Sequence, residues 1–151
     1  MGTLKEGEMN KPISTKVRQW RAAWVGLACA LALHVTDEAL TGFLPMCNGI
    51  VQGVRARHPW VPFPVFTFPV WLGGLVLVVV LLLGLTPFVS RGQRWIRLVS
   101  LVLAVIMMGN ALGHIGVSLY WDRAIPGVYS SPFLLAAAVA LFATAWRARK
   151  H

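Results

Sequence analysis

The hydrophobic positions of this 151-residue chain gather into four long apolar runs, which short polar segments separate. The runs cover residues 22–44, 65–89, 95–119 and 132–146. An α-helix needs about 20 mostly apolar residues to cross the hydrocarbon core of a bilayer. The first three runs reach this length, and the fourth needs its flanking residues to span. The pattern predicts an all-α integral membrane protein with a four-helix transmembrane bundle in one domain, residues 19–151, after a mobile basic cytoplasmic tail, residues 1–18.

Composition and charge agree with a membrane location. The chain is 57% hydrophobic and only 13% charged, whereas soluble domains average about 45–50% and 25%. Its formal net charge of +9 comes from short clusters rather than a basic stripe with interleaved aromatics, so we expect no nucleic-acid partner. With four spans, eleven of the 14 Lys and Arg fall on one side. The positive-inside rule then predicts cytoplasmic N and C termini and a location in the cytoplasmic (inner) membrane.

The beginning of the chain also fits a second interpretation. A basic segment, an apolar stretch at 22–33 and Ala30-Leu31-Ala32 together are typical of a cleaved secretory signal. The apolar pattern resumes through Phe43-Leu44, which gives the whole segment spanning length. We therefore interpret it as the first span. Cleavage after Ala32 would leave three spans with the same charge balance, so topology alone leaves this alternative open.

Three polar residues interrupt the middle of the first run: His34, Asp37 and Glu38. An ionised carboxylate near the centre of a membrane helix costs about 2.5–3.5 kcal/mol, and such residues usually face a bundle interior. At 100° per residue all three share one face of a helix. They are therefore the first candidates for a functional site.

A second polar face is predicted in the third run. Asn110, His114 and Ser118 are four residues apart and so lie within an arc of about 80° on a helix. Glycines flank this face at three positions, Gly109, Gly113 and Gly116. Small residues permit close approach of helices in membranes, so we expect this face to pack closely against the polar face of the first span.

Depth along the two helices predicts which of these groups meet. Counted from the arginines at the cytoplasmic ends, His34 and Asn110 both lie about 20 Å along their helices, and Glu38 and His114 both about 25 Å. We therefore predict that His34 contacts Asn110 and that Glu38 contacts His114. Apart from Arg97 at the cytoplasmic end of the third run, the spans hold no Lys or Arg. A buried carboxylate must therefore be protonated, bound to a metal, or paired with a histidine or an inward-reaching arginine.

Two chemistries fit this set. His34, Glu38 and His114 offer two imidazoles and a carboxylate, which suit a divalent ion, zinc or non-haem iron, and leave coordination positions open. Asp37 would be a fourth ligand or an acceptor that orients an imidazole. Without a metal, the same carboxyl and imidazole groups form a pair for general acid–base catalysis or proton coupling. Ser118 is predicted to be an ordinary helix hydroxyl rather than a nucleophile.

These motifs resemble a known family. The segment Leu33-His34-Val35-Thr36-Asp37-Glu38-Ala39 is similar to the first-helix motif of the bacterial HXXEE-domain integral membrane proteins, which have no established activity. His114 looks like the second histidine of the family, and Ala124-Ile125-Pro126-Gly127 looks like its Tyr-x-Pro-Gly element, with Ala124 in place of the tyrosine and Asp37 in place of the first glutamate. The resemblance covers residues 24–145. It implies a small multi-helix membrane fold in which these residues form one site, and it implies no substrate.

The sequence thus favours an intramembrane enzyme of hydrolase or oxidase type, metal-dependent or acid–base, that acts on a membrane lipid or another small lipophilic molecule. The candidate catalytic residues are Glu38, Asp37, His34, His114 and Asn110. We expect a pocket toward the outer leaflet between the first and third spans, capped by Pro126-Gly127 and the 45–64 connection. The glycines and prolines of this connection predict an interfacial loop on the outer surface. The alternatives are a non-catalytic, proton-coupled binding or transport component, which would require a homodimer or a partner subunit, and a structural membrane subunit.

Overall fold

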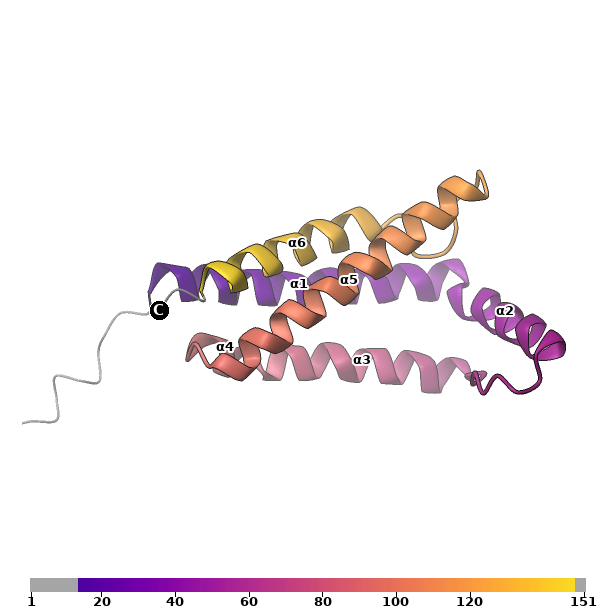
Figure 1. Ribbon diagram of the computed structural model, residues 1–151, viewed down its shortest axis with the longest axis horizontal. Coiled ribbons are helices and arrows are strands. Elements are labelled where there is room, and N and C mark those ends of the chain that lie inside the picture. Colours follow the sequence, from indigo (N-terminus) through magenta and orange to yellow (C-terminus); the bar gives the residue numbers. More distant parts are fainter. Residues whose placement is uncertain (1–13, 149–151) are drawn as a thin grey trace, which may run out of the picture.

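The computed structural model describes residues 14–148, and this part of the chain contains helices and loops but no strand. Figure 1 shows the helices running roughly along one long axis. In chain order they are α1 (Thr15–Thr41), α2 (Phe43–Arg57), α3 (Phe68–Gly84), α4 (Thr86–Ser90), α5 (Arg94–Tyr120) and α6 (Ser131–Arg147). The prediction of an all-helical fold is confirmed for these residues.

Helix α1 has defined ends. The Ser14 hydroxyl accepts a hydrogen bond from the Val17 amide at 3.4 Å and so caps the first turn. The helix ends at Gly42, whose φ of 84° is left-handed, and the Gly42 amide donates to the Glu38 carbonyl. Helix α1 therefore begins and ends earlier than the predicted run at 22–44. Residues 1–13 of the predicted tail lie outside the described residues.

The 45–64 connection differs from the prediction. We expected an interfacial loop from its glycines and prolines, but residues 43–57 form helix α2. Pro45 lies in the first turn, where the amide that it lacks would have no partner within the helix. The Asn48 side chain then ties α2 to the segment before α3, because it donates to the Phe66 carbonyl at 2.9 Å and accepts from the Phe66 amide at 3.2 Å.

Among residues 14–148, three helical stretches are long and apolar enough to cross a membrane: Thr15–Thr41, Phe68–Ser90 and Arg94–Tyr120. The second consists of α3 and α4, which meet at Leu85 two residues before Pro87. Helix α6 is apolar but shorter, with 17 residues. At 1.5 Å per residue it is about 26 Å long.

Helix α6 packs against both α1 and α5, and α1 also packs against α3 and α4. Fully buried side chains from α1 and α6 form the centre of the bundle, among them Trp20, Leu27 and Leu141. Trp20 donates its indole N–H to the Ser100 hydroxyl of α5 at 3.0 Å. Trp24 donates to the Leu82 carbonyl of α3 at 2.7 Å. These buried hydrogen bonds fix the register of α1 against its neighbours.

The expected close packing of the α5 glycines is wrong. A Cβ atom added at Gly109, Gly113 or Gly116 would meet nothing within 4 Å. Few backbone positions of α1 and α5 approach each other, whereas α6 packs against both helices. The side chains of His34 and Glu38 nevertheless reach Asn110 and His114 of α5, and these contacts build the site.

Candidate functional site

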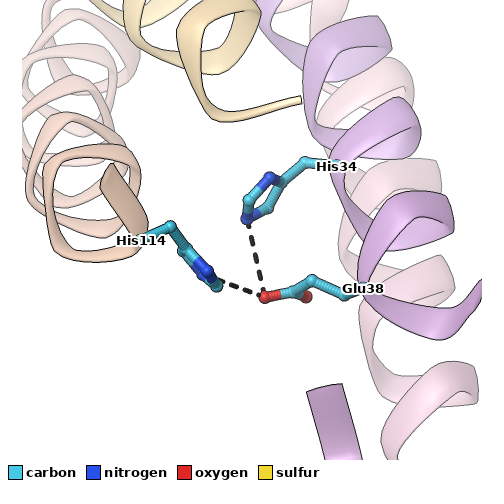
Figure 2. A group of neighbouring side chains, drawn as sticks. All are labelled: His34, Glu38 and His114. Atoms are coloured by element: carbon cyan, nitrogen blue, oxygen red, sulfur yellow. Dashed lines mark ion pairs between the residues drawn. The ribbon is translucent and has the colours of Figure 1, made fainter. Parts of the chain in front are cut away.

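Three buried side chains converge where α1 faces α5 (Figure 2). Glu38 Oε1 lies 3.2 Å from His114 Nε2 and 3.5 Å from His34 Nε2. The three residues are at most 6% exposed. Each offers one possible ligand atom, and these atoms lie within 4.8 Å of one another. Glu38 therefore meets His114 as the depth calculation predicted.

His34 is oriented by hydrogen bonds on both ring nitrogens. Its Nδ1 lies 2.8 Å from the Ser130 hydroxyl, which itself donates to the Asp37 carboxylate at 2.8 Å. The Asn110 amide nitrogen beside Nε2 can only donate, so the proton of a neutral His34 ring is assigned to Nδ1, which donates to Ser130. Nε2 then carries the lone pair, and it accepts a hydrogen bond from the Asn110 amide at 3.1 Å. The predicted contact between His34 and Asn110 is confirmed.

His114 has the same tautomer for a different reason. Its Nδ1 lies 2.7 Å from the Pro126 carbonyl, which can only accept a hydrogen bond. Nδ1 is therefore the protonated nitrogen of the neutral ring, and Nε2 points its lone pair at Glu38. The ring also lies edge-on to His34, with centroids 4.9 Å apart, and 5.4 Å from the ring of Phe43 in α2.

The Nε2 atoms of both imidazoles and Oε1 of Glu38 thus lie close together, with the lone pair of His34 Nε2 engaged by Asn110. An unprotonated Nε2 and a carboxylate oxygen 3.2 Å apart are both acceptors and repel each other unless a proton or a cation lies between them. Each imidazole has its other nitrogen fixed by an oxygen acceptor, which is the arrangement found around metal-bound histidines. The geometry can hold a shared proton or a divalent cation.

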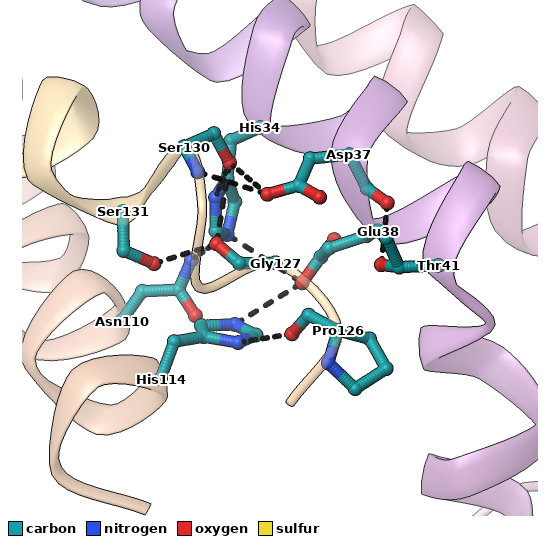
Figure 3. A network of polar contacts seen from close by, with 10 residues as sticks. All are labelled: His34, Asp37, Glu38, Thr41, Asn110, His114, Pro126, Gly127, Ser130 and Ser131. Carbon is teal, nitrogen blue, oxygen red and sulfur yellow. Dashed lines mark hydrogen bonds and ion pairs between the residues drawn. The ribbon is translucent and has the colours of Figure 1, made fainter. Parts of the chain in front are cut away.

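Asp37 lies beside this group rather than in it (Figure 3). Its Oδ2 accepts hydrogen bonds from both the amide and the hydroxyl of Ser130, at 2.9 and 2.8 Å. Of the two roles considered from sequence, this position matches an acceptor that orients an imidazole, since Ser130 connects Asp37 to His34. The Asp37 carbonyl accepts a further hydrogen bond from the Thr41 hydroxyl at 2.6 Å.

The loop before α6 covers the site through Pro126 and Gly127. Gly127 has a φ of +86° and is buried against His114 and Glu38. A Cβ there would lie 2.8 Å from His114 Cε1 and 3.0 Å from Glu38 Cγ. Only glycine combines this backbone conformation with this close approach. Pro126 and Gly127 therefore cover the His114–Glu38 pair. They do not line the pocket beside His114, which lies between α2 and α5 and not between the first and third predicted spans.

Sequence reasoning missed Ser130. Its only signal was the polar pair Ser130-Ser131 before Pro132, which is also the ordinary composition of a helix start. Ser131 donates to the Gly127 carbonyl at 2.7 Å and so holds the loop shape. Ser118, which we predicted to be an ordinary helix hydroxyl and not a nucleophile, accepts a hydrogen bond from the Ile125 amide at 3.1 Å. This contact ties the loop after α5 to the helix.

A pocket of about 460 Å³ opens beside His114, between α2 and α5. This volume lies within the range of about 300–1,000 Å³ that is typical of small-molecule sites. Its wall is mainly apolar, and the polar side chains at its edge include Asn110 and His114. The lining residues from α2 are Phe43, Met46, Cys47 and Ile50, and those from α5 include Gly109, Gly113 and Val117. Gly109 and Gly113 therefore provide space for the pocket.

The chain matches no family model, no curated protein and no solved structure. Its resemblance to the HXXEE-domain membrane proteins stays a prediction from the motifs around His34 and His114.

Proposed function

We propose that this protein is an intramembrane enzyme that binds a divalent ion, zinc or iron, through His34, Glu38 and His114 and acts on a small lipid-like substrate. The observation that carries the proposal is the convergence of one ligand atom each from His34, Glu38 and His114, within 4.8 Å of one another. Ser130 and Pro126 hold the Nδ1 sides of the two rings, so that both Nε2 atoms lie beside Glu38. Two imidazoles and a carboxylate leave further coordination positions for water or substrate.

A bound ion would supply Lewis acidity or an activated water. The residues of the chain would hold it and keep it away from bulk water, since all three ligands are buried. Ligation by His34 would replace the Asn110 hydrogen bond at Nε2. The Asn110 amide lines the adjacent pocket, where it could then orient a polar group of the substrate.

The pocket supports a lipophilic substrate. Its wall between α2 and α5 is mainly apolar, and His114 lies at its edge. A molecule with a hydrocarbon portion would bury that portion against Met46, Ile50 and Val117, while its polar end reached the histidine. Burial of apolar surface would contribute roughly 25 cal/mol per Å² to such binding.

We further propose four membrane crossings with both termini in the cytoplasm. The start of α1, the start of α5 and the end of α6 lie together, since Ser14, Arg94 and Ala148 line one pocket. Within residues 14–148, seven of the ten Lys and Arg lie toward this end of the bundle, which the positive-inside rule assigns to the cytoplasm.

The metal is tested by elemental analysis of protein purified in mild detergent without chelators. We expect close to one zinc or iron per chain in the wild type, and loss of the metal in His114→Gln and Glu38→Gln. His58→Gln is the matched control, because His58 lies at the end of α2 outside the group. Size-exclusion chromatography and circular dichroism verify that each variant is folded. Absence of metal from the folded wild type would leave acid–base catalysis by Glu38 and His114.

Catalysis is tested separately by incubating the protein with a total membrane lipid extract and analysing it by mass spectrometry. We expect the wild type to convert at least one lipid, and Glu38→Gln to convert none, with His58→Gln as the active control. If neither the wild type nor His58→Gln converts a lipid while the metal is bound, the enzyme proposal is wrong and the site is a binding or structural one.

A further inference from the structure

A second cavity lies at the opposite end of the bundle from α2, between α1 and the α3–α4 junction. Its volume is about 1220 Å³. Figure 1 shows α4 beside the first half of α1 at this end. We call this cavity the basic groove, and it is lined by Arg18, Arg21, Ala22, Val25, Gly26, Leu83, Thr86, Pro87, Ser90 and Arg91.

The groove has a charged end and an apolar end. Arg18, Arg21 and Arg91 lie where α1 begins and α4 ends. Within residues 14–148, none of these three guanidinium groups forms an ion pair with a carboxylate. The Arg91 guanidinium lies 5.9 Å from the centroid of the Phe88 ring. An anion entering the groove would therefore find cationic groups that no carboxylate of residues 14–148 pairs with.

The apolar end lies deeper along the helices. Gly26 is five residues beyond Arg21, about 7.5 Å further along α1 at 1.5 Å per residue. Val25 and Leu83 form the wall at that depth, and a Cβ at Gly26 would meet nothing within 4 Å. A ligand that fits both ends is amphipathic, with an anionic head at the arginines and hydrocarbon below.

We propose that the basic groove binds an anionic phospholipid, with its phosphate between the arginines and part of an acyl chain against Val25 and Leu83. Guanidinium groups bind phosphate oxygens through paired N–H donors, and basic pockets between membrane helices bind anionic head groups. The apolar end distinguishes this ligand from a free phosphate. The inference does not depend on the proposed enzyme, whose residues lie at the other end of α1.

The test is a lipid titration of the full chain in neutral detergent, followed by native mass spectrometry. The probes are phosphatidylglycerol and phosphatidylcholine with identical acyl chains. We expect the wild type to bind phosphatidylglycerol at least about tenfold more tightly. The variant Arg18→Gln/Arg21→Gln/Arg91→Gln should lose this preference. The control variant Arg55→Gln/Arg57→Gln/Arg123→Gln removes the same charge outside the groove and should keep it.

A second pair of variants tests the shape of the groove without changing charge. Gly26→Phe should fill the apolar end and weaken phosphatidylglycerol binding at least about fivefold, since the ring would take the place of the acyl chain. Gly73→Phe is the control, because Gly73 is also open on one side but does not line the groove. Metal content measured on the same samples reports on the other site independently.

Three results would overturn the proposal. The first is equal binding of both lipids by the wild type, and the second is equal loss of the preference in the two arginine variants. The third is full competition by millimolar inorganic phosphate, because that result would make the groove a site for small anions.

Discussion

A single residue, Gly127, limits the space around His114 and Glu38. Its backbone is left-handed, and its α-carbon faces His114 and Glu38. We predict that Gly127→Ala lowers the free energy of unfolding by about 1–2 kcal/mol through the backbone conformation alone. The added methyl group also displaces His114 and Glu38. Bound metal should therefore be lost, as measured by elemental analysis of the purified variant.

Gly42→Ala separates these two effects. Gly42 has nearly the same φ, 84°, but a Cβ there would meet nothing within 4 Å. It should lose similar stability, measured as the denaturation midpoint in detergent, and keep its metal. Equal metal content in the two variants would show that contact with Gly127 does not shape the site.

Ser130 is predicted to matter through His34 rather than through direct ligation. It accepts the His34 Nδ1–H hydrogen bond and connects that ring to Asp37. Removal of such a supporting contact typically weakens metal binding about 10- to 100-fold. We expect Ser130→Ala to raise the Kd for zinc by this factor in a chelator competition assay.

Ser131→Ala provides the comparison for Ser130. Ser131 is also buried and also donates to the Gly127 carbonyl, but it has no contact with His34. Its Kd for zinc should change less than about threefold, since it is outside the ligand-orienting contacts. A similar loss in both serine variants would point to a general effect on the loop.

Helix periodicity was enough to place His34, Glu38, Asn110 and His114, because each pair lies at matching depth on two regular helices. It could not place Ser130, which reaches Asp37 from a loop 93 residues further along the chain. Loop conformation depends on local turns such as the left-handed Gly127, and neither polarity nor spacing reveals where such a loop folds back.

At the scale of elements, the pocket between α2 and α5 gives the third prediction. A side chain at Gly113 would project into open space that belongs to the pocket. Gly113→Leu should therefore fill the pocket and abolish lipid conversion while the metal stays bound. Gly116→Leu adds the same side chain to an equally open position outside the pocket lining and should leave conversion unchanged. Loss of conversion in both would locate the substrate elsewhere.

The element boundaries show which patterns were misleading. Apolar residues continue from α1 into Phe43-Leu44, but the left-handed Gly42 ends the helix before them. Proline and glycine between 45 and 64 suggested a loop, although Pro45 fits the first turn of α2. The α5 glycines suggested close contact with another helix. Small residues permit either a close neighbour or a cavity, and the sequence does not distinguish these two outcomes.

At the scale of the whole molecule, the loop before α6 determines where this last helix begins. Helix α6 begins at Ser131, next to Ser130 at the level of His34, and ends beside the start of α1. Helix α5 ends at Tyr120, beyond His114. The loop at 121–130 therefore returns inward to the depth of the site. Irregular backbone is tolerated at such depth where it is buried in protein, as it is at Ile125, Gly127 and Ser130.

This geometry predicts four crossings, although α6 alone is only about 26 Å long, because the 121–130 loop supplies the remaining distance. Green fluorescent protein fused after His151 should fluoresce, and alkaline phosphatase fused there should be inactive, which places the C terminus in the cytoplasm. In a Cys29→Ser/Cys47→Ser background, Arg57→Cys should react with an impermeant maleimide from outside, and Gln93→Cys should not. If α6 did not cross, the C terminus would lie on the side of Arg57, opposite Gln93. An active phosphatase fusion would then reject the four-crossing topology while leaving the contacts among His34, Glu38 and His114 unaffected.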